Sequence, residues 1–201
     1  MSDPAQVPLP LAWPARADAA AFVLGPANAQ AAAWLAQPQL WPMPRTLLVG
    51  PPGSGKSHLA GLFARGHAAT VIDDAETRDP EFLFHAWNAA TPARPLLLTA
   101  ATRHWPHGLP DLASRLAATP QVQIGDPDDA LLAALMAKQF TDRGLTVGDD
   151  VLAWLVRRME RSFAAAAETV ARLDAAALAQ RRAITVPLAR EVLDGQGTLA
   201  L

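Results

Sequence analysis

A glycine-rich segment after a short apolar run constrains the fold of this chain more than any other feature. The apolar run 46–49 precedes it, a helical pattern follows it, and the segment itself reads Gly50, Pro51, Pro52, Gly53, Ser54, Gly55, Lys56 and Ser57. This is the G-x-x-x-x-G-K-[ST] phosphate loop in its strand–loop–helix context. Its glycines let backbone N–H groups face phosphate oxygens, while Lys56 suits the terminal phosphates and Ser57 a Mg²⁺ ion. The sequence therefore predicts an α/β protein that binds a nucleotide.

Two acids at the end of the next apolar run form the second expected part of the site. Residues 68–72 lead directly into Asp73 and Asp74. Asp73 is the candidate to hold Mg²⁺, directly or through water, and Asp74 is the candidate to orient the attacking water. A capping or loop role stays open for both, because Glu76 and Asp79 make the whole region acidic.

Further nucleotide contacts are expected on either side of this pair. Phe22 and Val23 precede the phosphate-loop strand and could contact an adenine ring, although their spacing suits a core role equally well. Thr99, at the end of the run 95–99, or Thr102 could contact the γ-phosphate, because ligands of open α/β sheets bind at the carboxyl ends of the strands. Either threonine could equally be a loop hydroxyl.

Residue patterning divides the chain into three parts. We expect an extended arm over 1–20, an α/β nucleotide-binding subdomain over 21–125 and an all-helical lid over 126–201. The lid is expected because the residues from Asp126 to Asp129 form a strong helix start and apolar residues then recur at helical spacing. The middle part holds apolar runs for a parallel sheet of about four strands, at 46–49, 68–72, 95–99 and 122–124.

The arm contains a candidate docking peptide, which consists of Gln6, Val7, Pro8, Leu9, Pro10 and Leu11. A glutamine followed by spaced aliphatic residues suits a hydrophobic groove, and the prolines keep the peptide extended at low entropic cost. The residues alone do not distinguish this peptide from an ordinary proline-rich tail.

Composition excludes several classes of protein. The chain has no cysteine, so a disulfide framework and a thiolate metal site are excluded, and its five histidines form no metal-ligand pattern. A net charge of −2 gives no overall attraction to nucleic acid, so direct sequence-specific DNA binding is not expected. No apolar run is long enough to span a membrane and no signal segment opens the chain, so we expect a cytoplasmic protein.

The arrangement as a whole resembles the AAA+ proteins related to the replication initiator DnaA, and within them the Hda-type regulatory inactivators of DnaA. Besides the phosphate loop, the resemblance rests on the peptide 6–11, the segment LPDLASRL at 109–116 and the run 158–193. It implies that the arm binds the DNA polymerase sliding clamp and that ADP or ATP with Mg²⁺ occupies the phosphate loop. It also implies that Arg115 is an arginine finger for ATP bound to DnaA, and that the DNA-binding and helicase-interaction domains of a full initiator are absent.

One departure from the family concerns the sheet. Between Ser57 and Asp73 the chain has room for a single helix and a single strand, where the family fits an additional strand and helix. We therefore predict a shortened sheet in which the strand containing Val71 is an exposed edge.

A second departure concerns the residues that sense the nucleotide. The family's lid arginine falls at Ala164, which leaves Arg161 as a displaced substitute, and Ala100 with Ala101 replaces the acidic sensor of the initiators. These losses predict weak or no ATPase activity by the chain itself.

Two functions are consistent with these residues. The first is a regulator of chromosome replication initiation that docks on the clamp and stimulates hydrolysis of DnaA-bound ATP through Arg115 supplied in trans. The alternative is a self-sufficient AAA+ ATPase of helicase-loader type that acts on DNA, in which Arg115 serves a neighbouring copy of the chain. A homodimer stays open in both. A surface ion pair within the chain is the plain structural role for Arg115.

Overall fold

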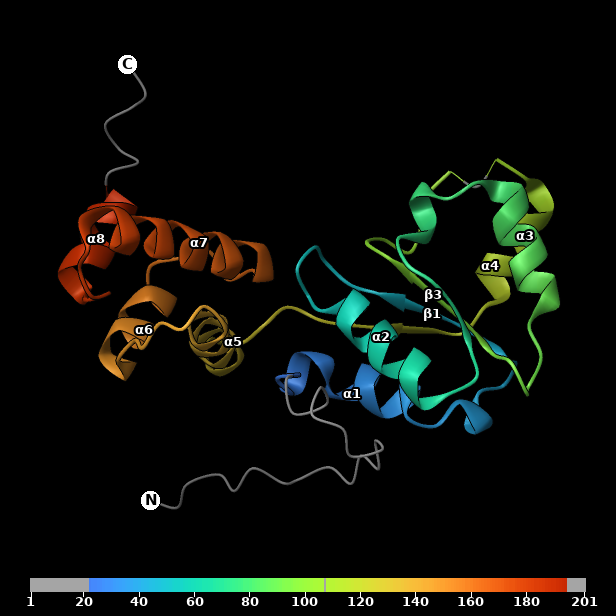
Figure 1. Ribbon diagram of the computed structural model, residues 1–201. Coiled ribbons are helices and arrows are strands. Elements are labelled where there is room, and N and C mark those ends of the chain that lie inside the picture. Colours follow the sequence, from blue (N-terminus) through green and yellow to red (C-terminus); the bar gives the residue numbers. More distant parts are fainter. Residues whose placement is uncertain (1–21, 107, 195–201) are drawn as a thin grey trace.

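The computed structural model describes residues 22–106 and 108–194 of the 201-residue chain. The whole predicted arm (1–20), including its peptide, therefore lies outside the described residues. The elements in chain order are α1 (Pro26–Leu35), η2 (Pro38–Leu40), β1 (Arg45–Val49), α2 (Lys56–Gly66), β2 (Thr70–Ile72), η3 (Ala75–Thr77), α3 (Pro80–Ala89), β3 (Leu96–Ala100), α4 (Pro110–Ala118), β4 (Gln121–Gln123), α5 (Asp129–Asp142), α6 (Asp149–Val156), α7 (Phe163–Gln180) and α8 (Val186–Asp194) (Figure 1).

The four strands form one parallel sheet in the order β2-β3-β1-β4. The two central strands, β1 and β3, are buried almost throughout, as expected for a parallel sheet covered on both faces. The two edge strands have three residues each. This confirms the predicted short sheet and places the strand containing Val71 on an edge. Because all strands run the same way, their carboxyl ends share one side of the sheet.

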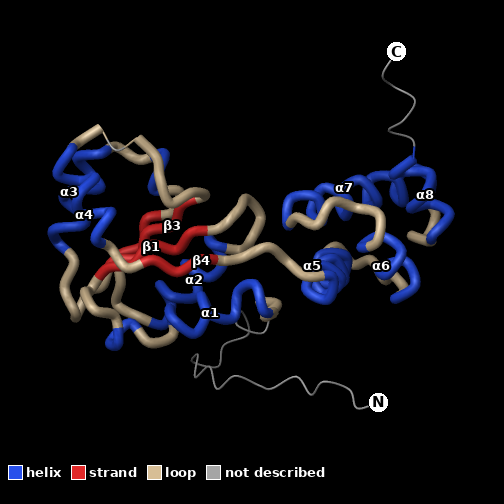
Figure 2. Tube along the Cα trace, turned by 180° about the vertical axis from the view of Figure 1, so that it is seen from behind, coloured by secondary structure: helices blue, strands red, loops and turns tan. Residues whose placement is uncertain are grey.

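Helices cover both faces of the sheet. Leu48 of β1 and Leu97 of β3 pack against α1 and α2, while their neighbours Leu47 and Leu98 pack against α3 and α4 on the other face. Successive side chains of a strand point to opposite faces, so these two apolar runs supply both layers. The result is a three-layer α/β unit, with α3 and α4 on the side opposite α1 and α2 (Figures 1 and 2).

Helices α5 to α8 pack around a separate apolar core. Its fully buried residues include Leu132, Met136, Leu155, Val170, Leu173, Leu188 and Ala189. Leu131 and Phe163 instead join the α1–α2 side of the sheet core, and so anchor the helical part to the α/β part. No helix in the described part of the chain has both the length and the apolar character needed to cross a bilayer.

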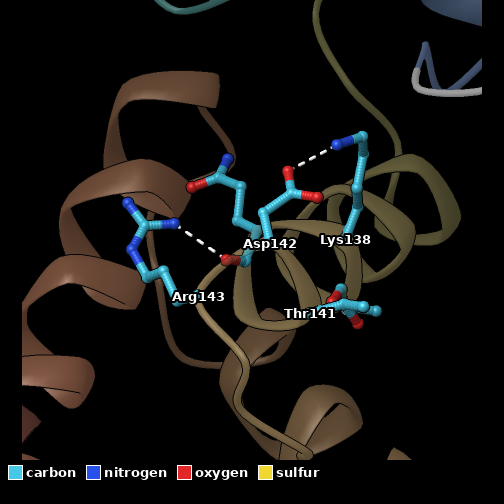
Figure 3. A network of polar contacts seen from close by, with 6 residues as sticks. Lys138, Thr141, Asp142 and Arg143 are labelled. Carbon is cyan, nitrogen blue, oxygen red and sulfur yellow. Dashed lines mark hydrogen bonds and ion pairs between the residues drawn. The ribbon is translucent and has the colours of Figure 1, made fainter. Parts of the chain in front are cut away.

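Polar contacts close the end of α5 (Figure 3). Lys138 pairs with Asp142 one turn further on, and the Thr141 hydroxyl donates to the Ala137 carbonyl at 2.9 Å. Arg143, just past the helix, donates to the Gln139 carbonyl at 2.8 Å. A cation at this position neutralises the negative end of the helix and satisfies a carbonyl that the helix leaves free.

Three rings form a stack at α2, and a fourth ring, that of His67, is tilted against the end of it. The ring centroids of Trp34 and Trp41 are 6.2 Å apart, those of Trp41 and Phe63 are 5.4 Å apart, and those of Phe63 and His67 are 4.9 Å apart. His67 lies half-buried at the end of the stack. Burial lowers the pKa of the His67 imidazole, because the protonated form loses hydration there.

This lowered pKa predicts a pH-dependent stability. As pH falls through about 6.5, the unfolded chain protonates His67 before the folded chain does, so the free energy of unfolding decreases. We expect a fraction of one additional proton to be taken up on unfolding, measured as the pH dependence of thermal melting between about pH 7.5 and 5.5. His67→Gln should show a weaker dependence than the wild type. An identical dependence in both proteins would contradict this assignment.

Candidate functional site

The phosphate loop lies between β1 and α2, at the carboxyl end of the sheet. Gly53 and Gly55 have φ values of 77° and 87°, a region that favours glycine. The helix after the loop begins at Lys56, so its positive end faces the loop. The local conformation that the motif predicts is therefore present.

Lys56 is buried inside the loop. Its Nζ donates to the Gly50 carbonyl at 2.8 Å and to the Pro51 carbonyl at 3.2 Å. A buried ammonium needs such partners, and these two hold it over the backbone that would surround a phosphate. Ser57 is exposed on the first turn of α2, where its hydroxyl is accessible to a metal ion.

The acid pair follows β2 as predicted, and β3 supports it. Thr99 is fully buried, and its hydroxyl donates to Asp73 Oδ1 while it accepts a hydrogen bond from the Asp74 N–H at 3.0 Å. The structure thus uses the Thr99 hydroxyl to orient Asp73. A γ-phosphate contact by Thr99 stays a prediction, and Thr102 lies in the exposed loop beyond β3.

The backbone at Asp74 is strained. Its φ of 50° and ψ of 56° are left-handed values that side chains other than glycine adopt at a cost. Asp74 is exposed at this bend, at the carboxyl end of the sheet.

Glu76 brings a further acid to the same end of the sheet, one that the sequence did not single out. Its Oε1 accepts from the Ala101 N–H at 2.6 Å, directly after β3, and its Oε2 is buried without a partner in the described residues. Glu76 therefore holds a carboxylate beside Ala101, next to the positions to which the resemblance assigns the initiators' acidic sensor. The sequence signal for this role of Glu76 was limited to the acidic character of the segment after Asp74.

The described residues contain no group of three or more histidine, aspartate or glutamate side chains that could hold a metal ion by themselves. Magnesium needs no such group, because it usually takes one or two protein ligands together with water and substrate phosphates. Ser57 and Asp73 fit that requirement.

Phe22 lies beside the start of α2, and Val23 packs, partly buried, against the core on the α1–α2 side of the sheet. The Phe22 ring centroid is 5.5 Å from that of His58, and a β-carbon at Gly55 would come within 3.1 Å of the Phe22 ring. Asn28 fixes the segment, because its side chain donates to the Val23 carbonyl and accepts from the Gly25 N–H, both at 2.9 Å. Phe22 is therefore near the phosphate loop, and its contact with adenine stays a prediction.

The first turn of α7 reaches the phosphate loop (Figure 1). A β-carbon at Gly53 would lie 3.4 Å from Phe163 and 3.5 Å from the Ala164 nitrogen. Ala164, the position to which the resemblance assigns the family's lid arginine, therefore lies beside the loop. Arg161 points elsewhere, since it forms a two-point ion pair with Asp129 of α5 at 2.9 and 3.1 Å. Exposed pairs are weak, about 0–1 kcal/mol, so a nucleotide-sensing role for Arg161 stays a prediction.

Arg115 lies in the last turn of α4, half-buried against α3. Its guanidinium carbon is 4.9 Å from the centroid of the Phe84 ring and 4.8 Å from that of Trp87. Its side chain forms no ion pair or hydrogen bond with any described residue, and its Nε is buried without a partner. The predicted alternative, an ion pair within the chain, is therefore absent from the described residues.

Arg115 and the phosphate loop lie at opposite ends of the sheet. Trp87, which Arg115 contacts, also stacks on Arg45, the first residue of β1, whereas the loop follows Val49 at the end of β1. A five-residue strand spans roughly 13 Å between its first and last residue. Arg115 is therefore placed away from the nucleotide site of its own chain.

Comparisons with known proteins agree with this architecture. Residues 128–193 match the family model described as the lid domain of Hda. Domain III of the replication initiation protein DnaA from Thermotoga maritima superposes with a TM-score of 0.71 at 13% identity, over 88% of this chain and 95% of that one. The T. maritima RuvB Holliday junction branch migration motor gives a TM-score of 0.56 at 14% identity, over 75% of this chain and 61% of RuvB. A DNA replication initiation factor gives 0.58 at 11% identity, over 80% and 65%.

The phosphate loop on a short parallel sheet, followed by a helical part that contacts the loop, defines the AAA+ class. Within that class, the helical part of the chain is similar to the Hda lid over residues 128–193, and the chain has the fold of DnaA domain III.

Proposed function

We propose that this chain is a regulator of chromosome replication initiation that stimulates hydrolysis of ATP bound to DnaA by supplying Arg115 in trans. The placement of Arg115 carries the proposal. Its guanidinium lies away from its own phosphate loop and has no carboxylate partner among the described residues. An arginine so placed is free to neutralise phosphate charge in a second molecule. The test is single-turnover hydrolysis of ATP preloaded on DnaA, which should accelerate when the chain is added.

The chain's own nucleotide has a structural role in this proposal. Lys56 and the loop backbone would hold the phosphates of ADP or ATP, with Ser57 and Asp73 on Mg²⁺. The metal would neutralise phosphate charge when bound. Because the first turn of α7 contacts Gly53, a nucleotide in the loop would affect how the helical part packs against the loop. We place the boundary between the nucleotide-binding part and the lid at 125/126, just before α5 and its own apolar core.

We further propose that the arm docks the protein on the DNA polymerase sliding clamp. Gln6, Val7, Pro8, Leu9 and Pro10 lie outside the described residues, and their sequence pattern is the support for this step. Tethering raises the effective concentration of the chain near a second partner, so even weak docking has a large effect on rate.

The double substitution of Gln6→Ala and Leu9→Ala tests the docking step. We expect it to abolish capture of the chain on immobilised clamp, because both the polar and the apolar anchor of the peptide are removed. Nucleotide affinity should stay unchanged, since Lys56 and the loop are intact. Leu11→Ala alone is the milder comparison. Full retention of capture by the double variant would show that the arm is not the docking peptide.

One observation favours a second candidate, a self-sufficient ATPase of helicase-loader type that acts on DNA. Asp73 is oriented by Thr99, and Glu76 brings another carboxylate to the same end of the sheet. In that case Arg115 would serve a neighbouring copy of the chain. Steady-state ATP turnover by the purified protein, with and without DNA, separates the two functions, because only the second requires DNA-stimulated turnover without DnaA.

A further inference from the structure

Trp87, Thr119 and Arg115 form a cycle of contacts between α3 and the end of α4. The Trp87 indole Nε1–H donates to the Thr119 hydroxyl at 3.0 Å, and that hydroxyl donates to the Arg115 carbonyl at 2.8 Å. The Arg115 guanidinium then lies against the Trp87 ring, 4.8 Å from its centroid. Trp87 thus contacts Arg115 in two ways. Its indole N–H is linked through Thr119 to the Arg115 backbone carbonyl, and its ring packs against the Arg115 guanidinium.

Arg45 fixes Trp87 within this set. Its guanidinium carbon lies 3.9 Å from the Trp87 ring centroid, its Nε donates to the Trp87 carbonyl at 2.6 Å, and its Nη2 donates to the Ala90 carbonyl at 3.2 Å. These bonds occupy the Arg45 donors that face α3. Burial, and secondarily the charge of Arg115, lowers the pKa of Arg45, so the two guanidinium groups are close enough to repel each other.

The guanidinium groups of Arg45 and Arg115 differ in how firmly they are held. Arg45 is tied to two carbonyls, whereas the Arg115 side chain has no hydrogen bond or ion pair in the described part of the chain. Arg45 is therefore fixed by hydrogen bonds, whereas the orientation of the Arg115 guanidinium depends on its contacts with the Phe84 and Trp87 rings.

We propose that Trp87, held by Thr119 and Arg45, is a positioning residue that aims the Arg115 guanidinium out of α4. The expected effect of Trp87 on DnaA–ATP hydrolysis rests on the proposed function. The restraint of the Arg115 side chain by Trp87 does not depend on that function. A catalytic group displaced by about 1 Å loses on the order of 10²-fold in rate. Trp87 therefore affects the rate of the hydrolytic step and leaves the affinity for the partner nearly unchanged.

Trp87→Leu is the direct test, because it removes the ring face and the indole donor together. We expect the maximal rate of DnaA–ATP hydrolysis, at saturating concentrations of the chain, to fall about 10- to 100-fold. The concentration that gives half-maximal stimulation should change less than about threefold, since Arg115 itself is retained. Trp87→Phe should recover only part of the rate, because a phenyl ring still presents a face to the guanidinium but lacks the indole donor to Thr119.

The chain offers a matched control in Trp34. Its indole Nε1–H donates to the Thr46 hydroxyl at 2.9 Å, which donates to the Pro120 carbonyl at 3.0 Å, so Trp34→Leu breaks the same kind of bond pair. Trp34 lies on the opposite face of the sheet from α3 and α4. Trp34→Leu should leave the maximal rate within about threefold of the wild type, after both variants are shown to fold.

A measurement without DnaA tests whether Trp87 restrains the Arg115 side chain. The NMR order parameter of the Arg115 Nε–Hε bond should be high in the wild type and in Trp34→Leu, and low in Trp87→Leu and Thr119→Val. An unchanged order parameter in Trp87→Leu and Thr119→Val would overturn the proposal. If the wild type fails to stimulate DnaA, the proposed function fails while the NMR result still decides the role of Trp87. If Arg115→Ala abolishes stimulation and Trp87→Leu does not, this inference alone is wrong.

Discussion

Replacing Arg115 by alanine should reduce the stimulated hydrolysis of DnaA-bound ATP by about 10³-fold or more. An arginine supplied in trans stabilises the charge that develops on the transferring phosphoryl group, and this is worth about 10³ to 10⁵ in rate in other nucleotide hydrolases. The measurement is single-turnover hydrolysis of labelled ATP preloaded on DnaA, in the presence of the clamp and the variant.

The effect should be confined to catalysis. Arg115 is half-buried against two rings and has no ion pair in the described residues, so its removal costs little folding stability. Arg190→Ala, at an exposed position on α8, is the matched control and should retain full stimulation. If Arg115→Ala stimulates as well as this control, Arg115 is not the finger.

The second large effect is expected for Lys56→Ala. Removing a charged donor from the phosphate loop costs about 1.5–3 kcal/mol, which lowers the affinity for ADP and ATP about 10- to 100-fold. Titration with a fluorescent nucleotide analogue measures the loss. The loss is expected at the phosphate loop itself, because the Lys56 ammonium donates to the Gly50 and Pro51 carbonyls of the loop.

The chain has one other lysine, which makes the control simple. Lys138 pairs with Asp142 on α5, and Lys138→Ala removes the same charge far from the loop. We expect unchanged nucleotide affinity in that variant. Equal losses in the two variants would mean that net charge, and not the loop contact, governs binding.

The features predictable from the sequence were those that depend on neighbouring residues. The phosphate loop and the acid pair after β2 are local patterns, and each appears where it was expected. The helix start predicted over Asp126 to Asp129 is present, but the cap is Asp128, so Pro127 precedes the helix instead of lying in its first turn. The short interval between Ser57 and Asp73 also predicted the edge position of β2, since it leaves no room for another strand.

The contacts that the sequence did not predict join segments far apart along the chain. No local pattern indicates that Thr99 bonds Asp73, that Glu76 bonds the Ala101 N–H or that Phe163 packs against the phosphate loop. Each depends on how elements pack in three dimensions. The same holds for Arg115, because its motif indicated a finger but not the rings of α3 that support it.

Helix ends were also less predictable than helix positions. The helical spacing of the apolar residues at 151, 152, 155, 156 and 159 predicts a helix over about 149–160, but α6 ends at Val156. The Arg158 guanidinium carbon lies 4.3 Å from the centroid of the Trp154 ring, one turn back, and the segment beyond it turns toward Ser162, which caps α7 by accepting from the Ala165 N–H. A capping serine starts a new helix because its side chain satisfies one of the free N–H groups of the first turn.

Trapping of a transition-state complex tests the central claim most directly. A group that acts only on the developing charge binds a transition-state analogue more tightly than the product state. We therefore predict that this chain forms a stable complex with DnaA loaded with ADP and aluminium fluoride but not with ADP alone, as measured by gel filtration, and that Arg115→Ala loses this preference. Equal binding to both forms by the wild type, or an unchanged preference in Arg115→Ala, would contradict the account.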